Sequence, residues 1–176
     1  MTDILIRDAT PADIPALHRL IESAYRGEAS RAGWTTEADL LDGQRTDPDD
    51  LADILADPAQ AMLTAWRGDE LVGCVLIANR GEGTGYFGML SVNPVLQGSG
   101  LGRRLVEVAH AAMAERFGAR RVRISVFPQR NELIGWYRRL GYGLTGETLP
   151  FPYDEPRFGI PRRNDLHFVV MERALA

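Results

Sequence analysis

Residues 89–104 read MLSVNPVLQGSGLGRR and join a predicted strand to a predicted helix. The strand ends at Asn93-Pro94, and the helix begins within three closely spaced glycines. Glycine lets the backbone approach a ligand closely, and the first turn of a helix has unpaired N–H groups at the positive end of its dipole. Such a helix start suits a phosphate or pyrophosphate, with charge added by Arg103 and Arg104. A glycine-rich turn that only allows close packing of strand and helix is the alternative.

Two common nucleotide-binding motifs do not account for this turn. A Walker A loop ends in Gly-Lys-Ser/Thr, and the chain contains no lysine. A dinucleotide fingerprint has the pattern G-x-G-x-x-G, and here Arg103 stands where the third glycine would be. Residues 83–88 do match that spacing, but they lead into a predicted strand and not into a helix, which indicates a chance match.

Residues 97–102, QGSGLG, resemble the Q/R-x-x-G-x-G/A acyl-CoA signature of the GCN5-related N-acetyltransferase superfamily. Residues 90–94 before them resemble the fourth strand of that family. Downstream, residues 131–142, NELIGWYRRLGY, resemble the family's helix with its N-x(5)-Y-x(3)-G-[FY] ending. Two motifs in this order, separated by one helix and one strand, are far more specific than either alone. The resemblance is close over about residues 71–147 and looser at both ends.

The resemblance implies an α/β fold in one N-acetyltransferase domain spanning residues 1–176. A mixed central sheet is expected, flanked by helices and splayed at its fourth and fifth strands. The implied reaction moves an acetyl group from acetyl-CoA, as co-substrate, directly to a primary amine of a small molecule or peptide. The alternative is a non-catalytic acyl-CoA-binding sensor or interaction module on the same fold; an unrelated nucleotide-binding protein is a third reading. Homodimers are common in the family, and the sequence leaves the oligomeric state open.

The resemblance also assigns residues to the cofactor. Backbone N–H groups of the fourth strand are expected to bind the pantetheine arm and the acyl carbonyl, and the glycine turn the pyrophosphate. The residues implied are Leu90, Ser91, Val92, Gln97, Gly98, Ser99, Gly100, Leu101, Gly102 and Arg103. Asn131 is implied as a contact to the pantetheine arm, although asparagine is also an ordinary helix N-cap.

Tyr137 resembles the family's tyrosine beside the cofactor sulfur and is the predicted catalytic residue. A phenol has a pKa near 10 and a thiol one near 8.5, so full proton transfer to the leaving thiolate would run uphill by about 2 kcal/mol. A hydrogen bond that stabilises the thiolate is therefore the expected role, unless the pKa of the phenol is lowered. The alternative is a core aromatic residue that packs beside Trp136.

The sequence gives weaker indications of the residues that bind the acceptor amine. Many relatives carry a Glu or His on the fourth strand as a general base, and this chain has neither there. The family builds its acceptor pocket between the first helices, and a predicted amine-binding patch there comprises Glu28, Trp34, Glu37 and Asp39. These charges favour a cationic amine, with ordinary surface positions as the alternative. Residues 150–158, PFPYDEPRF, are expected to cover the acceptor channel, to contact a second subunit, or simply to connect two strands.

Composition narrows the partners and the compartment. The formal net charge of −4 argues against a nucleic acid as the main partner. The single cysteine, Cys74, excludes an internal disulfide framework and suits the cytoplasm, while the spacing of histidines and cysteine predicts no metal site. No signal segment or membrane-spanning run is expected.

Hydrophobic periodicity and turn residues place the remaining elements. Gly68-Asp69 predicts a hairpin, and His110 is expected on a helix surface. Helices are expected at 36–41, 48–55, 100–117 and 132–140, and late strands at 121–127, 142–148 and 165–172.

Overall fold

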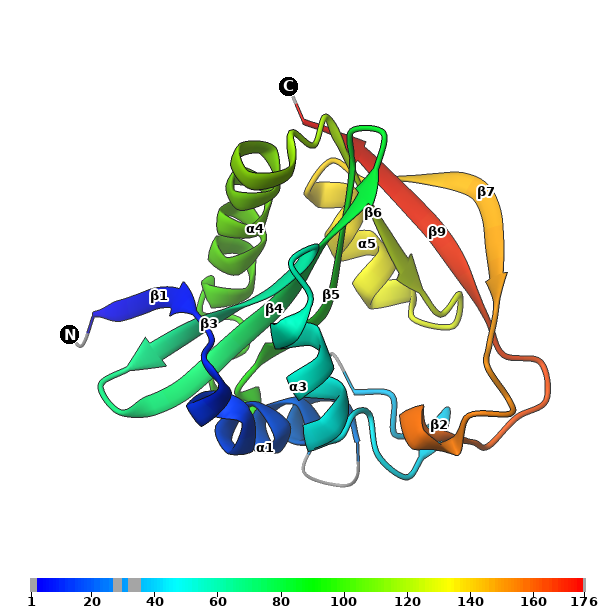
Figure 1. Ribbon diagram of the computed structural model, residues 1–176. Coiled ribbons are helices and arrows are strands. Elements are labelled where there is room, and N and C mark those ends of the chain that lie inside the picture. Colours follow the sequence, from blue (N-terminus) through cyan, green and yellow to red (C-terminus); the bar gives the residue numbers. More distant parts are fainter. Residues whose placement is uncertain (1–2, 27–29, 32–35, 176) are drawn as a thin grey trace.

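The computed structural model describes residues 3–26, 30–31 and 36–175, and its centre is a seven-stranded sheet (Figure 1). In spatial order the strands are β1 Ile4–Asp8, β3 Gln60–Arg67, β4 Glu70–Gly81, β5 Thr84–Val92, β6 Arg121–Val126, β9 His167–Ala174 and β7 Gly143–Pro150. A separate two-stranded sheet pairs β2 Leu41–Asp42 with β8 Ile160–Pro161. The helices are α1 Ile14–Tyr25, α3 Pro48–Ala56, α4 Leu101–Phe117 and α5 Asn131–Arg139, with short 3₁₀ turns η1 Pro11–Asp13, η2 Pro94–Leu96 and η3 Pro156–Phe158.

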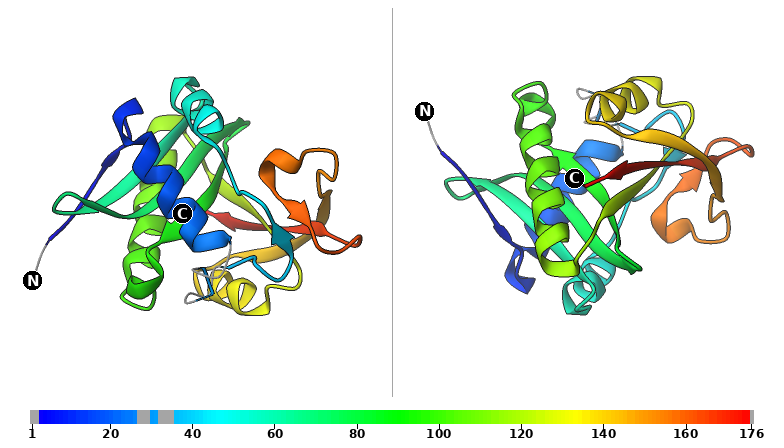
Figure 2. Two further views of the ribbon diagram at one scale, coloured as in Figure 1. Left: turned by 90° about the horizontal axis from the view of Figure 1, so that it is seen from below. Right: turned by 90° about the horizontal axis from the view of Figure 1, so that it is seen from above.

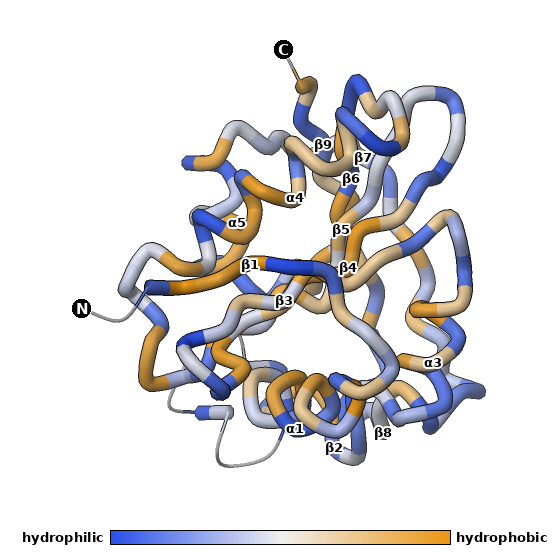
Figure 3. The backbone as a smooth tube through the Cα atoms, turned by 60° about the vertical axis from the view of Figure 1, so that its left-hand side comes forward, coloured by the Kyte–Doolittle hydropathy of each residue, from blue (hydrophilic) through white to orange (hydrophobic). Residues whose placement is uncertain are grey.

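Helices cover the sheet on both faces, and each face has its own hydrophobic core (Figures 1 and 2). On one side α1 and α3 pack against β3, β4 and β5 through Leu17, Ile21 and Leu51. On the other side α4 and α5 pack through residues such as Leu105 and Leu133. Hydrophobic residues follow β4 and β5 through the middle of the sheet (Figure 3), as expected for strands covered on both faces.

The fourth and fifth strands of the large sheet, β5 and β6, separate along most of their length. They form the sheet's parallel pair, and the pairing covers only Thr84–Tyr86 against Arg121–Arg123. Beyond it, β5 contains a bulge opposite β4, and Met89 takes a positive φ of 51°. A bulge bends its strand and interrupts pairing, so β5 turns away from β6. The predicted fold and its splay are confirmed.

Most predicted elements have their expected type and position. The hairpin across Gly68-Asp69 joins β3 to β4, and α3, α4 and α5 lie within one residue of their predicted bounds. The helix predicted at 36–41 is wrong, because residues 38–40 form a turn and Leu41 enters β2. The Thr36 hydroxyl accepts the N–H of Ala38 at 3.1 Å, and such a local bond competes with a helix.

His110 does not lie on the surface of α4 as expected but is buried, with 8% of its area exposed. Arg173 Nη1 donates to His110 Nδ1 at 3.3 Å, and His110 Nε2 lies 2.6 Å from the Tyr142 hydroxyl. Burial lowers the pKa of His110 to about 4, and the charge of Arg173 acts in the same direction. A neutral imidazole therefore links α4 to β9 and to the segment after α5.

Among the described residues, the structure contains no helix long and apolar enough to cross a membrane.

Candidate active site

A groove of about 690 Å³ lies between β5, the glycine turn and α5. The walls come from three short segments of the chain. They comprise Leu90, Val92, Gln97, Gly98, Gly100, Gly102, Arg103, Asn131, Glu132, Gly135, Trp136 and Arg139.

The glycine turn presents bare backbone to this groove. Gly98 and Gly100 have φ values of 89° and 90°, which L-residues rarely adopt, and a Cβ atom at either would meet no atom within 4 Å. The first backbone bond of α4 runs from the N–H of Arg104 to the carbonyl of Gly100 at 3.1 Å. No side chain caps the helix, so the N–H groups of residues 101–103 have no backbone partner among the described residues. These donors at the positive end of α4 fit a pyrophosphate.

The edge of β5 that faces the splay offers further backbone donors. The Leu90 carbonyl accepts the Tyr25 hydroxyl at 2.5 Å, and the Val92 carbonyl accepts Gln97 Nε2 at 3.2 Å. The N–H and C=O of one residue in an extended strand point to the same side. The N–H groups of Leu90 and Val92 therefore point into the gap, while Ser91 pairs with Cys74 on β4.

Eight of the eleven residues predicted to contact the cofactor line the groove; Ser91, Ser99 and Leu101 do not. Ser99 is exposed, and Leu101 is buried in the core. Arg103 lines the groove with its Nε 3.1 Å from Glu107, whereas Arg104 donates to the Ile4 carbonyl on β1. The following lining residues were not predicted but share one face of α5 at helical spacing: Glu132, Gly135, Trp136 and Arg139.

Asn131 is the first residue of α5, and the N-cap position belongs to Arg130. No side-chain hydrogen bond from Asn131 caps the helix, and Asn131 lines the groove. The structure thus does not show the N-cap role for Asn131, and its contact with the cofactor stays a prediction.

A second cavity, of about 280 Å³, lies on the other side of Leu90, which lines both. Eight of its twenty lining residues are aromatic, and the lining comes from segments far apart in the chain. The aromatic residues include Tyr25, Phe87, Phe127, Tyr137, Phe151 and Phe168. The proline-rich loop contributes Phe151, Pro152 and Phe158, so it does border this cavity. No sequence signal marks Tyr25, Arg26 or Arg45 as neighbours of these residues, because the fold alone brings them together.

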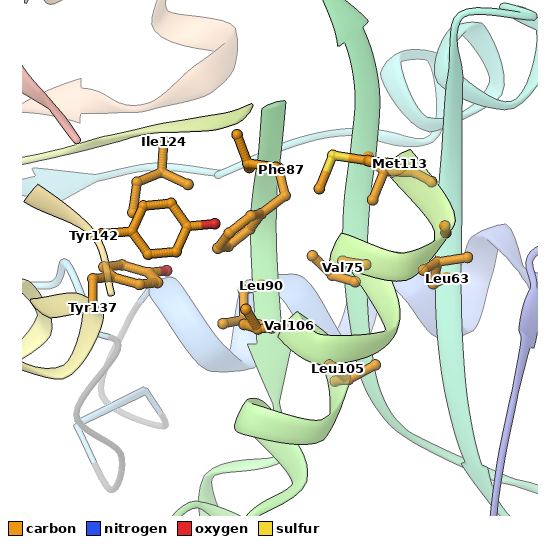
Figure 4. Close-up of a cluster of buried hydrophobic side chains, with 14 of the residues drawn as sticks. Leu63, Val75, Phe87, Leu90, Leu105, Val106, Met113, Ile124, Tyr137 and Tyr142 are labelled. Atoms are coloured by element: carbon orange, nitrogen blue, oxygen red, sulfur yellow. The ribbon is translucent and has the colours of Figure 1, made fainter. Parts of the chain in front are cut away.

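Tyr137 extends from α5 into the second cavity, which Leu90 also lines. Its ring packs edge-to-face with Phe87 and with Tyr142, each at 5.8 Å between ring centroids (Figure 4). Its hydroxyl forms no hydrogen bond within the described part of the chain. Burial raises the pKa of Tyr137 well above its usual range, and Tyr25 and other nearby tyrosines act in the same direction. The phenol therefore stays protonated and keeps a free O–H donor.

Of the four predicted amine-binding residues, the structure describes Glu37 and Asp39, and it does not place these two in one patch. Glu37 lines the aromatic cavity, but it pairs with Arg26 at 2.5 Å and lies 3.7 Å from Arg130. Asp39 pairs with Arg31, and its side chain is 80% exposed outside the cavity. Glu28 and Trp34 fall outside the described residues.

No cysteine or histidine lines either cavity within the described ranges. Cys74 is buried in β4, and burial raises the pKa of its thiol to about 12. A thiol of this kind is a poor nucleophile, because the thiolate is the reactive form.

The sequence matches one protein family over most of its length. The model of the Acetyltransferase (GNAT) family matches residues 16–142. No curated protein matches the sequence.

Solved structures share the whole fold at low sequence identity. The ribosomal-protein-alanine N-acetyltransferase of Brucella melitensis is 22% identical with a TM-score of 0.71, covering 97% of this chain and 99% of its own. Ard1 of Thermoplasma volcanium is 17% identical with a TM-score of 0.72 and 98% coverage of both chains. The protein yncA of Salmonella typhimurium, solved with its cofactor acetyl-CoA, is 20% identical with a TM-score of 0.68, covering 98% and 94%.

Proposed function

The chain belongs to the GNAT family of acetyltransferases, and we propose that it transfers an acetyl group from acetyl-CoA directly to a primary amine of a small molecule or peptide. The family uses acetyl-CoA as its acetyl donor. The observation that carries the proposal is the meeting of two cavities at Leu90. One cavity presents backbone donors that have no backbone partner among the described residues, the other is lined by Tyr137 and further aromatic side chains, and Leu90 stands at their junction.

The groove residues fit this donor. The turn from Gly98 to Arg103 would hold the pyrophosphate through backbone N–H groups and the Arg103 guanidinium. Asn131 and the wall of α5 would contact the pantetheine arm. The N–H groups of Leu90 and Val92 would bind the acyl carbonyl, and such fixed donors stabilise the charge that develops on its oxygen.

The reaction then needs three events at the junction. A neutral amine nitrogen attacks the carbonyl carbon of the thioester, the new C–N bond forms, and the C–S bond breaks. The sulfur leaves as a thiolate, and Tyr137 donates a hydrogen bond to it without giving up its proton. The attacking nitrogen loses one proton, and the thiolate finally gains one, so charge and atoms balance.

Removal of the amine proton does not require a side-chain base in this proposal. Glu37 is the one carboxylate that lines the aromatic cavity within the described residues, and Arg26 and Arg130 already share its charge. We therefore propose that the proton passes to solvent. The value of kcat/KM should then rise with pH around the pKa of the free amine substrate. Two substrates whose amines differ in pKa should therefore give two different pH profiles.

The test is calorimetric titration with acetyl-CoA followed by thiol release against a panel of primary amines. Binding together with thiol release on any amine supports the enzyme. Binding without release on a broad panel supports the alternative, an acyl-CoA sensor. Absence of binding overturns the assignment of the glycine turn.

A further inference from the structure

The aromatic cavity contains a positive charge that no carboxylate among the described residues neutralises. Arg45 lines the cavity and is only partly exposed. Its guanidinium lies over the Tyr25 ring, 5.5 Å from the centroid. Within residues 3–26, 30–31 and 36–175 it forms no ion pair with a carboxylate. A partly desolvated, unpaired cation favours an anionic ligand.

The other charges of this cavity are already engaged. Arg26 and Glu37 form a salt bridge, and Arg26 Nη2 also donates to the Phe158 carbonyl at 3.0 Å. This pair is neutral as a unit, so Arg45 leaves the described lining with one excess positive charge. An excess positive charge repels a second ammonium group, which argues against a polyamine as the acceptor.

The position of Arg45 is fixed by its backbone. Glu22 Oε1, on α1, accepts the N–H of Arg45 at 2.7 Å and the N–H of Thr46 at 3.0 Å. The next residue, Asp47, caps α3 by accepting the N–H of Asp50 at 2.7 Å. The residue is thereby held between two helices, and its side chain extends over Tyr25, whose hydroxyl contacts Leu90. The Arg45 guanidinium therefore lies over the same tyrosine whose hydroxyl reaches Leu90.

Size and lining define the rest of the ligand. A volume of about 280 Å³ corresponds to roughly nine water molecules in the liquid, the scale of a single amino acid. Aromatic rings form another part of the lining, including Phe127, Phe151 and Phe168. Such a wall binds an apolar or aromatic body.

We propose that the acceptor is an apolar or aromatic amino acid whose carboxylate is bound by Arg45. This inference rests on the proposed acetyl transfer, and it names the acceptor class. The amine would reach the junction at Leu90 and Tyr137, the carboxylate would pair with the guanidinium, and the side chain would occupy the aromatic part of the cavity. A planar guanidinium matches a carboxylate in two parallel hydrogen bonds.

The experiment compares three amines that share one apolar body: phenylalanine, phenylalaninamide and phenethylamine. Thiol release is measured for the wild type, Arg45→Gln and the control Arg19→Gln, which removes an exposed arginine of α1 outside this cavity. The wild type should use phenylalanine with the highest kcat/KM of the three. Arg45→Gln should lower kcat/KM for phenylalanine about ten- to a hundredfold, change phenethylamine less than about threefold, and leave the cofactor affinity intact. Arg19→Gln should change neither.

Three results separate this inference from the proposed function. If phenethylamine or a diamine is the best substrate, or if Arg45→Gln affects all three amines equally, acetyl transfer stands and the carboxylate site is overturned. If no amine is acetylated, calorimetry with N-acetylphenylalanine and N-acetylphenethylamine still tests the cavity. Binding of the first that is lost in Arg45→Gln supports the carboxylate site, and equal or absent binding of both overturns it. Thermal unfolding of Arg45→Gln checks that the variant is folded.

Discussion

The groove and the aromatic cavity meet at one residue, Leu90, yet they are built in different ways. The groove takes its donors from backbone N–H groups of β5 and of the turn that follows it. The cavity takes its surface from side chains, which the fold gathers from α1, the segment before α3, β5, β6, α5 and the loop after β7.

This difference bears on what each region can tolerate. A backbone donor survives most substitutions, so the groove depends on the absence of side chains at a few glycines. A wall of side chains changes with each substitution, so the cavity can be altered without touching the groove. On the proposed function, a donor site fixed by the backbone lies beside an acceptor site that side chains can alter, so substitutions should separate the two.

The largest expected effect comes from filling the groove. A Cβ at Gly102 would lie 3.7 Å from Trp136, an ordinary contact, so Gly102→Leu keeps α4 while its longer side chain enters the groove. We expect the Kd for acetyl-CoA to rise about a thousandfold, or roughly 4 kcal/mol, by calorimetry. The control Ala111→Leu, on an exposed position of the same helix, should leave Kd unchanged. An unchanged Kd in Gly102→Leu would show that acetyl-CoA does not lie against this turn.

The free energy of unfolding should fall in acid because of the buried His110. Because the pKa of His110 falls from the ordinary 6.5 to about 4 in the folded protein, the unfolded chain binds an extra proton between these two values. The free energy of unfolding therefore rises with pH across this window and loses about 3 kcal/mol as pH falls from 6.5 to 4. Denaturant unfolding of the wild type and His110→Gln at several pH values measures it. The difference between the two proteins should vary with pH in this window, and a constant difference would contradict the buried neutral imidazole.

Tyr137→Phe should separate chemistry from binding. The variant loses the O–H donor and keeps the ring against Phe87 and Tyr142, so we expect kcat to fall about thirtyfold, or 2 kcal/mol. The Kd for acetyl-CoA and the stability should change little, because no protein group within the described residues bonds this hydroxyl.

Tyr142→Phe is the matched control for Tyr137→Phe. It removes the partner of His110 Nε2 and should lower stability by about 1–3 kcal/mol while leaving kcat within about twofold. If both variants lose turnover equally, Tyr137 has no special role at the leaving sulfur.

The groove could be predicted from the sequence because its parts are local. The turn at residues 97–103 and the helix from Asn131 are continuous segments with fixed spacing, and the resemblance covers both. The remaining wall, including Trp136 and Arg139, was not predicted, although the helical period from Glu132 would have found it.

The aromatic cavity could not be predicted in the same way. Arg26, Arg45 and Phe168 lie far apart in the chain, and nothing local marks them as neighbours. The charges of Glu37 and Asp39 suggested a site for a cationic amine, but ion pairing depends on tertiary contacts. Arg26 neutralises the first, and the second faces solvent.

The smallest expected effect comes from the residue that couples the two regions. Tyr25 lines the aromatic cavity with its ring and donates its hydroxyl to the Leu90 carbonyl at the edge of the groove. Burial raises the pKa of Tyr25, so the hydroxyl remains a donor. Tyr25→Phe keeps the wall and removes the bond. We expect a stability loss of about 1 kcal/mol and acetyl-CoA binding a few-fold weaker, because the Leu90 backbone is less firmly placed, with an unchanged KM for the amine.

A second hydroxyl bond provides the control for Tyr25→Phe. The Tyr153 hydroxyl accepts the N–H of Leu166 at 2.7 Å, and Tyr153 lines neither cavity. Tyr153→Phe should therefore cost similar stability without weakening acetyl-CoA binding. If Tyr25→Phe instead raises the KM for the amine and leaves the Kd for acetyl-CoA unchanged, the bond to Leu90 serves the cavity alone, and the two regions are less coupled than their shared residue indicates.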